Sequence, residues 1–305
     1  MQFIYRKMSG PAMLVLMFFI LLSFVGAQTE DAGVISVDSS IVVMNAVVTD
    51  AAGQAVRGLG MKHFKVFEEG QEQSIKQFEA EETPFAAVIL LDTSGSMEER
   101  VTLARSAAIQ FLDGLRAGDS AAIYSFHSKV ELVQDFSNSR DIAERIFDLK
   151  SNGMTVLNDA VYNAARLLSN RPEKRRAIIV LSDGADTLSS KSSDKAMRAA
   201  LLAGATIYTV DMAAIDTGGR DRMQNQGVLK NFAEKTGGKF VATPGGVALR
   251  DAFKRIVEEL GVQYTIAYEP SNLKRDGKWR AVELKVSKPN LTIRTRKGYN
   301  APKGP

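Results

Sequence analysis

The sequence contains no cysteine and only two histidines, His63 and His127, in 305 residues. Without cysteine the chain has no disulfide bond, no cysteine nucleophile and no lipid attached to a cysteine. Two histidines cannot form a histidine cluster of the kind that binds zinc, so we interpret both as ordinary structural residues. A chain of this length can fold without disulfides, because its core is large.

Neither sign of charge dominates the sequence. Lys and Arg number 39 against 35 Asp and Glu, which gives a formal net charge of +4. This balance gives no support to nucleic-acid binding, which depends on a strong excess of positive charge. Hydrophobic residues make up 45% of the chain, enough for the core of one large domain or of two smaller ones.

The longest apolar run lies near the N-terminus and is shorter than a typical membrane-spanning helix. It covers residues 12–25, follows the basic pair Arg6 and Lys7, and ends in small residues that suit a signal peptidase. We therefore interpret residues 1–27 as a secretory signal, with the mature chain beginning at Gln28 in the periplasm or outside the cell. An uncleaved membrane anchor is the alternative.

Two segments, residues 28–83 and 262–305, show the alternating patterns of β-strands and no helix-length period. Neither segment alone has enough strands for a stable core. We therefore expect residues 34–80 and 262–299 to join in one β-sandwich into which an α/β domain is inserted.

Two turn signals predict hairpins within these β segments. Glu69-Gly70 lies between the apolar runs at 64–67 and 75–78, and we expect the two runs to pair. Asp276-Gly277 gives a strong turn signal between the runs that begin at Tyr264 and Val282, and we expect a second hairpin there.

Residues 84–261 alternate apolar strands with amphipathic helices, which predicts a doubly wound, mostly parallel, Rossmann-like α/β sheet. The run at 86–91 is apolar without alternation, as expected of a strand covered on both faces. Further strands are predicted at 121–126, 130–136, 176–181, 206–212 and 239–243. Helices are predicted at 101–115, 142–149, 157–168, 193–203, 228–235 and 247–260.

Small oxygen-bearing side chains gather where two of these strands end. Asp92, Ser94 and Ser96 follow the first strand in a tight turn, and Asp183 follows a second buried strand. Thr155 lies just ahead of a predicted helix. Ligands of open α/β sheets bind beyond the carboxyl ends of strands, and oxygen-only donors suit a hard cation such as Mg²⁺. A helix-capping role for Asp92 and Ser96 is the alternative.

These residues resemble a known site. The stretch D-T-S-G-S at 92–96, with Thr155 and Asp183, resembles the metal-ion-dependent adhesion site of von Willebrand factor A domains, and the similarity covers about residues 84–261. Beyond it, the chain resembles the exported VWFA-related family described from acidobacterial genomes. The motifs that carry this wider resemblance are V-x-x-x-V-V-T-D-x-x-G ending at Gly53, H-F-K-V-F-E-E-G at 63–70, T-G-G at 236–238, Q-Y-T-I-A-Y at 263–268 and R-x-R-K-G-Y at 294–299.

The resemblance implies a role for each residue of the site. Ser94, Ser96 and Thr155 would offer hydroxyl groups to Mg²⁺, or to Mn²⁺ or Ca²⁺ in its place. Asp92 and Asp183 would bind the cation directly or through water. The cation would then accept an Asp or Glu carboxylate from a protein partner, so the function implied is non-catalytic adhesion or complex assembly. It implies no nucleic acid, no small-molecule substrate, and a membrane only if the signal stays uncleaved.

An enzyme is the main alternative function. Haloacid-dehalogenase-like phosphotransferases use an aspartate at the end of the first strand as nucleophile, a role open to Asp92, but Ser94 breaks their D-x-D pattern. The sequence has no P-loop, no H-E-x-x-H and no G-x-S-x-G pattern. Ser192-x-x-Lys195 has the spacing of penicillin-binding proteins, but Ser192 or Ser193 is better explained as a helix cap. A purely structural role at the cell surface is the third class.

Overall fold

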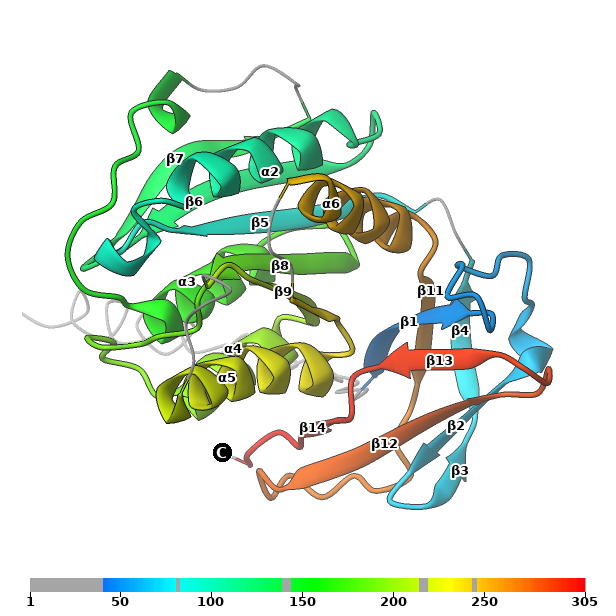
Figure 1. Cartoon of the computed structure of the whole chain (residues 1–305). Helices are drawn as coiled ribbons and strands as arrows, with labels where there is room; N and C mark the ends of the chain where they lie inside the picture. The colour runs from blue at the N-terminus through cyan, green and yellow to red at the C-terminus, as the bar shows by residue number, and fades with distance from the viewer. Residues whose placement is uncertain (1–40, 81–82, 139–143, 214–218, 243–245, 305) are drawn as a thin grey trace, which may run out of the picture. The chain divides into compact units, whose positions relative to one another are not determined.

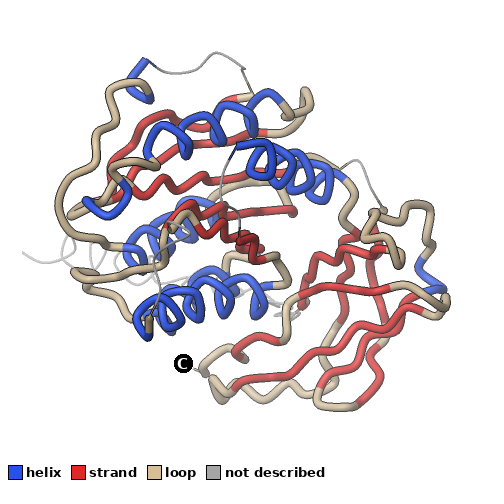
Figure 2. The backbone as a smooth tube through the Cα atoms, viewed as in Figure 1, coloured by secondary structure: helices blue, strands red, loops and turns tan. Residues whose placement is uncertain are grey.

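The structure is a computed structural model that describes residues 41–80, 83–138, 144–213, 219–242 and 246–304. The predicted signal, residues 1–27, lies outside these ranges. The described residues belong to one unit, which has a helix-rich α/β part and a part built almost wholly of strands (Figure 1, Figure 2). Within the described ranges, no helix is long and apolar enough to cross a lipid bilayer.

A six-stranded sheet forms the centre of the α/β part, with strand order β10-β9-β8-β5-β6-β7. Every neighbouring pair is parallel except β6 and β7, which are antiparallel. The strands are β5 (Phe85–Asp92), β6 (Ser120–Phe126), β7 (Val130–Ser137), β8 (Arg175–Ser182), β9 (Ala205–Asp211) and β10 (Phe240–Ala242). This is the mostly parallel α/β fold that the sequence predicts.

Helices cover both faces of this sheet (Figure 1). The helices are α2 (Val101–Asp113), α3 (Leu157–Ser169), α4 (Ser193–Leu202), α5 (Arg220–Thr236) and α6 (Gly246–Gly261). Every residue of β5 is buried: Phe85 and Ile89 join a core with α2 and α6, whereas Val88 and Leu90 join a core with α3, α4 and α5. Two covered faces explain why the first strand is apolar without alternation.

Two antiparallel sheets of four strands make up the other part, with orders β13-β1-β11-β4 and β14-β12-β2-β3. Each sheet combines strands from both ends of the chain: β1 pairs with β11 and β13, and β2 pairs with β12. The strands are β1 (Val42–Thr49), β2 (Phe64–Glu68), β3 (Gln71–Gln73), β4 (Ile75–Glu79), β11 (Tyr264–Tyr268), β12 (Trp279–Val286), β13 (Thr292–Thr295) and β14 (Gly298–Asn300).

Side chains from both antiparallel sheets share one core. Met44 and Tyr264 from the first sheet pack with Val66 and Leu284 from the second, and all four are buried. The rings of Phe64 and Tyr264 lie 5.1 Å apart between their centroids. The strands that flank the α/β part therefore form a β-sandwich, as the sequence predicts.

The predicted hairpin between residues 64–67 and 75–78 is wrong. Glu69 and Gly70 form a two-residue turn with φ of 49° and 82°, and the turn pairs β2 with the short strand β3. Positive φ at both central residues is the geometry of the type I′ hairpin turn. The chain then changes sheets, so that β4 pairs with β11.

The second predicted hairpin is also wrong, because β11 and β12 lie in different sheets. The Asp276 carboxylate accepts the backbone N–H of Lys278 at 3.0 Å and binds Arg280 at 2.9 Å, so it organises its own loop. Of the helix expected at 142–149, the described part contains only the 3₁₀ turn Glu144–Ile146. Helix α5 begins earlier than expected, at Arg220.

Candidate metal centre

Three loops meet at the carboxyl edge of the six-stranded sheet. The first, residues 93–97, follows Asp92, the last residue of β5. The second, residues 151–156, precedes α3, and the third, residues 183–190, follows Ser182, the last residue of β8. Strands β5 and β8 are parallel neighbours, so their ends lie together and bring the first and third loops close.

Asp92 is fully buried, and both of its carboxylate oxygens accept hydrogen bonds. The backbone N–H of Ser94 donates to Oδ1 at 2.9 Å, and the hydroxyl of Ser182 donates to Oδ2 at 2.5 Å. Burial raises the pKa of Asp92 to about 6; the two serines oppose this shift, and the negative charge of Asp183 adds to it. Asp92 forms no salt bridge with any residue that the structure describes.

Ser94 and Ser96 place their hydroxyl oxygens 3.1 Å apart. Ser94 is buried and Ser96 is exposed, so the pair leads from the buried carboxylate to the surface. The 3₁₀ turn that starts after Ser94 has no side-chain cap, and α2 begins at Val101 after an uncapped Arg100. These contacts do not support the helix-capping alternative for Asp92 and Ser96.

Backbone hydrogen bonds tie the first loop to the second. The N–H of Asn152 donates to the carbonyl of Thr93 at 2.9 Å, and the N–H of Gly95 donates to the carbonyl of Gly153 at 3.1 Å. Thr155, two residues further on, is buried. The first and second loops are therefore held in a fixed register beside Asp92.

The second loop is tied in turn to the third. The N–H of Thr155 donates to Oγ1 of Thr187 at 2.9 Å, and the N–H of Thr187 returns a bond to the carbonyl of Thr155 at 2.9 Å. Asp183 is partly buried, and its Oδ1 accepts the N–H of Ala185 at 3.0 Å. Ser94, Ser96, Thr155 and Asp183 thus lie on three loops beside Asp92 at the end of β5, and the second loop hydrogen-bonds to both of the others.

The structure adds one residue that the sequence reasoning missed. Ser182 accepts the N–H of Gly184 at 3.0 Å while it donates to Asp92, so it links the first and third loops. A hydroxyl residue immediately before Asp183, at the end of a buried strand, was the available signal. Gly184 itself has φ of 84°, and a Cβ there would lie 2.5 Å from the carbonyl oxygen of Asn225 in α5.

The donor set fits a hard divalent cation. It offers two carboxylates and three hydroxyls, the oxygen donors that Mg²⁺, Mn²⁺ and Ca²⁺ accept. Among the described residues, no group of three or more His, Cys, Asp or Glu side chains could hold a metal. A cation here would therefore depend on the hydroxyls of Ser94, Ser96 and Thr155 as much as on Asp92 and Asp183.

Comparisons with known proteins identify the α/β part. Residues 87–185 match the model of the von Willebrand factor type A domain. Among the curated proteins, none matches this chain. A solved von Willebrand factor type A structure from Catenulispora acidiphila is 16% identical, with a TM-score of 0.51, and the alignment covers 86% of this chain and 74% of that one.

Two further solved structures are similar over a smaller share of the chain. BatB from Bacteroides thetaiotaomicron is 20% identical with a TM-score of 0.48, over 58% of this chain and 98% of that one. The PilB minor pilin from Streptococcus sanguinis is 14% identical with a TM-score of 0.46, over 59% of this chain and 61% of the pilin. The chain thus spans less than two thirds of the pilin's length. The matched domain model and the fold together show that this chain contains a von Willebrand factor type A domain.

Proposed function

We propose that this domain binds one divalent cation at Asp92 and through it captures an acidic side chain of a protein partner, without catalysing a reaction. The observation that carries the proposal is the buried Asp92 carboxylate, which has hydroxyl and N–H partners but no basic one among the described residues. A bound Mg²⁺, Mn²⁺ or Ca²⁺ would supply the missing positive charge.

The neutral donors in the site would leave a bound cation able to accept a further ligand. Ser94, Ser96 and Thr155 bring no charge, so two carboxylates would only balance a divalent cation. A balanced, incompletely surrounded cation still attracts one more oxygen from outside. Ser96 is exposed and Asp183 is only partly buried, so an outside carboxylate can reach this edge.

The surface beside the site suits a protein partner. Met154 and Leu188 flank Thr155 and its backbone partner, and they are 49% and 51% exposed. Large apolar side chains this open to water gain free energy when a partner covers them. The partner segment that we propose therefore carries an acidic residue between apolar neighbours.

The neighbouring carboxylates support a binding role over a hydrolytic one. Asp159 accepts the backbone N–H groups of Ser190 and Lys191 at 2.9 and 2.8 Å, and Asp186 accepts that of Asn158 at 2.7 Å. These carboxylates hold loops in place and are not poised to activate water. Both oxygens of Asp92 already accept hydrogen bonds, which disfavours its use as a phosphotransferase nucleophile.

We place this function outside the cytoplasm, because residues 1–27 have the pattern of a secretory signal. Mass spectrometry of the native protein gives the test. A chain that begins at or near Gln28 supports export. An intact Met1 in the membrane fraction supports the anchor, and a soluble cytoplasmic chain with Met1 contradicts both.

Partner capture from the native extracellular fraction tests the mechanism. The wild type should retain a partner with Mg²⁺ and lose it with EDTA, and Asp92→Ala should retain none. The matched control Asp113→Ala, which changes an exposed aspartate at the far end of α2, should behave as the wild type. Capture that survives both EDTA and Asp92→Ala would refute the proposal. Metal-dependent release of phosphate from test esters, absent in Asp92→Ala, would favour the phosphotransferase.

A further inference from the structure

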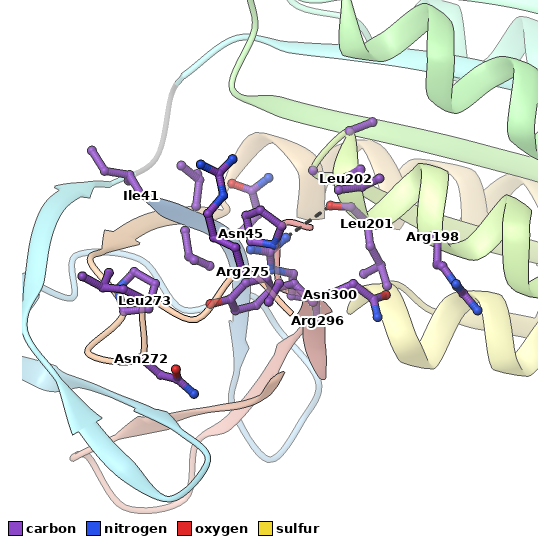
Figure 3. Close-up of a pocket in the computed structure, with 18 of the residues that line it drawn as sticks. Ile41, Asn45, Arg198, Leu201, Leu202, Asn272, Leu273, Arg275, Arg296 and Asn300 are labelled. Atoms are coloured by element: carbon purple, nitrogen blue, oxygen red, sulfur yellow. Dashed lines mark hydrogen bonds between the residues drawn. The ribbon is translucent and has the colours of Figure 1, made fainter. Parts of the chain in front are cut away.

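A pocket of about 390 Å³, drawn in Figure 3, contains residues from the amino edge of the six-stranded sheet. The candidate metal centre is at the other edge. The pocket is bounded by the start of β1, the C-terminal end of α4, the loop at 270–275 and the segment at 296–302. Strand β8 connects the two places, since Arg176 lines the pocket and Ser182 donates to Asp92. Six residues of strand separate them by roughly 20 Å.

Every charged residue that lines this pocket is basic. The lining contains no Asp or Glu, and its cations are Lys174, Arg176, Arg198, Lys274, Arg275 and Arg296. Lys174 forms an ion pair with Glu79. Arg198 forms no salt bridge with any carboxylate in the described part of the chain. The pocket therefore carries a net positive charge that its own lining does not neutralise.

Two of these guanidinium groups are held by carbonyl oxygens and not by carboxylates. Arg176 donates to the carbonyls of Glu173 and Ala203 at 2.8 and 2.9 Å. Arg296 donates to the carbonyl of Leu201 at 3.3 Å, and its buried Nε has no hydrogen-bond partner among the described residues. Burial lowers the pKa of both groups. A carbonyl satisfies a donor but leaves the charge, so an anion would gain from this environment.

Large apolar side chains stand around the same opening. Leu202 at the end of α4 is 78% exposed, Leu273 in the facing loop is 70% exposed, and Ile41 before β1 is 41% exposed. Figure 3 shows Ile41 and Leu273 on one side of the pocket and Leu202 on the other, with Arg296 between them. Apolar side chains around cationic groups suit a ligand that has both an apolar and an anionic part.

We propose that this pocket binds a small amphiphilic anion, with a phosphate or carboxylate head on an alkyl body. The volume falls within the range of small-molecule sites, roughly 300 to 1,000 Å³. The head would meet the arginines, and the alkyl body would cover the exposed leucines. A free amphiphile and the headgroup end of an anionic lipid share this chemistry. The proposal does not depend on the metal centre, because no pocket-lining residue belongs to its loops.

Titration calorimetry with decyl phosphate, below its micelle concentration and with EDTA present, tests the proposal. The full mature chain should bind this probe saturably, about tenfold or more tightly than inorganic phosphate or the uncharged decyl glucoside. Equal binding of decyl glucoside would show that charge plays no part. Equal binding of inorganic phosphate would show that the apolar wall plays no part, and either result overturns the proposal.

Two matched variants locate the binding. Arg198→Gln with Arg275→Gln should weaken decyl phosphate about tenfold, because two cations leave the pocket. Arg250→Gln with Arg255→Gln removes the same charge from exposed positions of α6, on the other face of the sheet, and should change nothing. Equal losses in the two variants, or no loss in the first, would contradict the assignment. Unfolding curves confirm that each variant is folded.

A last arm separates the two sources of the ligand. Vesicles of phosphatidylglycerol should sediment with the wild type, and not with the pocket variant, if the natural ligand is a lipid. If vesicles of phosphatidylglycerol and of phosphatidylcholine both leave the protein in solution while decyl phosphate binds, the ligand is a free amphiphile. Sedimentation that is equal in the wild type and the pocket variant would remove the pocket from membrane binding.

Discussion

The two edges of the six-stranded sheet bury opposite charges and hold them differently. At the carboxyl edge, the carboxylate of Asp92 is buried among hydroxyl and N–H donors. At the amino edge, the guanidinium of Arg175 is fully buried and donates to the carbonyls of Ala80 and Thr83 and to the hydroxyl of Thr265. Hydroxyl groups can turn toward a cation, whereas carbonyls in fixed backbone cannot move away from the guanidinium.

We propose that this difference separates a structural charge, Arg175, from a binding one, Asp92. Arg175 joins β8 to the segment after β4 and to β11, so it connects the α/β part with the sandwich. Asp92 connects loops of one edge and faces donors that a metal could replace or share. We therefore expect substitutions at Arg175 to act on folding and those at Asp92 to act on binding.

Replacement of Arg175 should have the largest effect on stability. Arg175→Met removes the buried guanidinium and at least three hydrogen bonds, two of them to partly buried carbonyls, which should lower the free energy of unfolding by about 4 kcal/mol. Urea unfolding measures this loss. Arg166→Met, at an exposed position of α3, is the matched control and should cost less than about 0.5 kcal/mol. Equal, small losses would show that Arg175 is not part of the framework.

The metal-free protein should lose stability as the pH rises past the pKa of Asp92. Its carboxyl group has a pKa of about 6 in the folded chain against an ordinary 3.8, so the folded state binds the proton more tightly than the unfolded state. The tighter binding of this proton therefore stabilises the folded state fully below about pH 3.8. This stabilisation falls between pH 3.8 and about 6 and is gone above that. A shift of this size corresponds to about 3 kcal/mol.

Asp92→Asn should remove this dependence, because the amide does not ionise. Urea unfolding in EDTA at pH 4.5 and 7.5 measures it in both proteins. The variant should be the more stable of the two at pH 7.5, and Mg²⁺ should stabilise only the wild type. An identical dependence of stability on pH in the two proteins would show that burial does not raise the pKa of Asp92.

A pair of glycines compares the backbone at the two edges. Gly184, at the carboxyl edge, has φ of 84° and faces the Asn225 carbonyl, while Gly204, at the amino edge, has φ of 64° and open space beside it. Gly204→Ala should lower the free energy of unfolding by only about 1 kcal/mol, because alanine is strained in the left-handed backbone conformation. Gly184→Ala should lower the free energy of unfolding by about 2 kcal/mol more than Gly204→Ala, since α5 must move to make room for the Cβ. Equal losses of stability in the two variants would mean that α5 moves without destabilising the protein.

Ser96→Ala should give the smallest effect. Ser96 is exposed, so water can take the place of its hydroxyl at a bound cation. We expect cation affinity to fall about fivefold, with unchanged stability in EDTA. Titration of Mn²⁺ measures it, and Ser106→Ala, on the exposed side of α2, is the control. A loss as large as that of Asp92→Asn would give the exposed hydroxyl a more central role.

The sequence predicts the α/β part better than the sandwich. The run from Ala86 to Leu91 predicts a strand that is covered on both faces, and the structure confirms this prediction. The end of that strand and the end of β8 also follow from the sequence, which is why Asp92 and Asp183 could be placed on one edge. The proposed ligand roles of these residues stay predictions.

Partner strands could not be read from turn signals. Glu69-Gly70 forms a hairpin, but with the short strand β3, and the expected partner β4 pairs with β11 instead. The strands on either side of Asp276-Gly277, β11 and β12, lie in different sheets. Local turn chemistry fixes a change of direction, whereas pairing depends on the shared core of Met44, Tyr264 and Leu284. The pocket at the amino edge could not be predicted from the sequence either, since its cations come from four separate segments of the chain.

Calorimetric titration of Mg²⁺ and Mn²⁺ into the metal-free wild type and Asp92→Asn tests the central claim most directly. The wild type should bind one cation per chain with weak to moderate affinity, because three of its five donors are neutral hydroxyls. The Asp92→Asn protein, shown to be folded by its unfolding curve, should bind none. Equal affinity in the two proteins, or no binding in the wild type, would contradict the account of this edge as a metal centre.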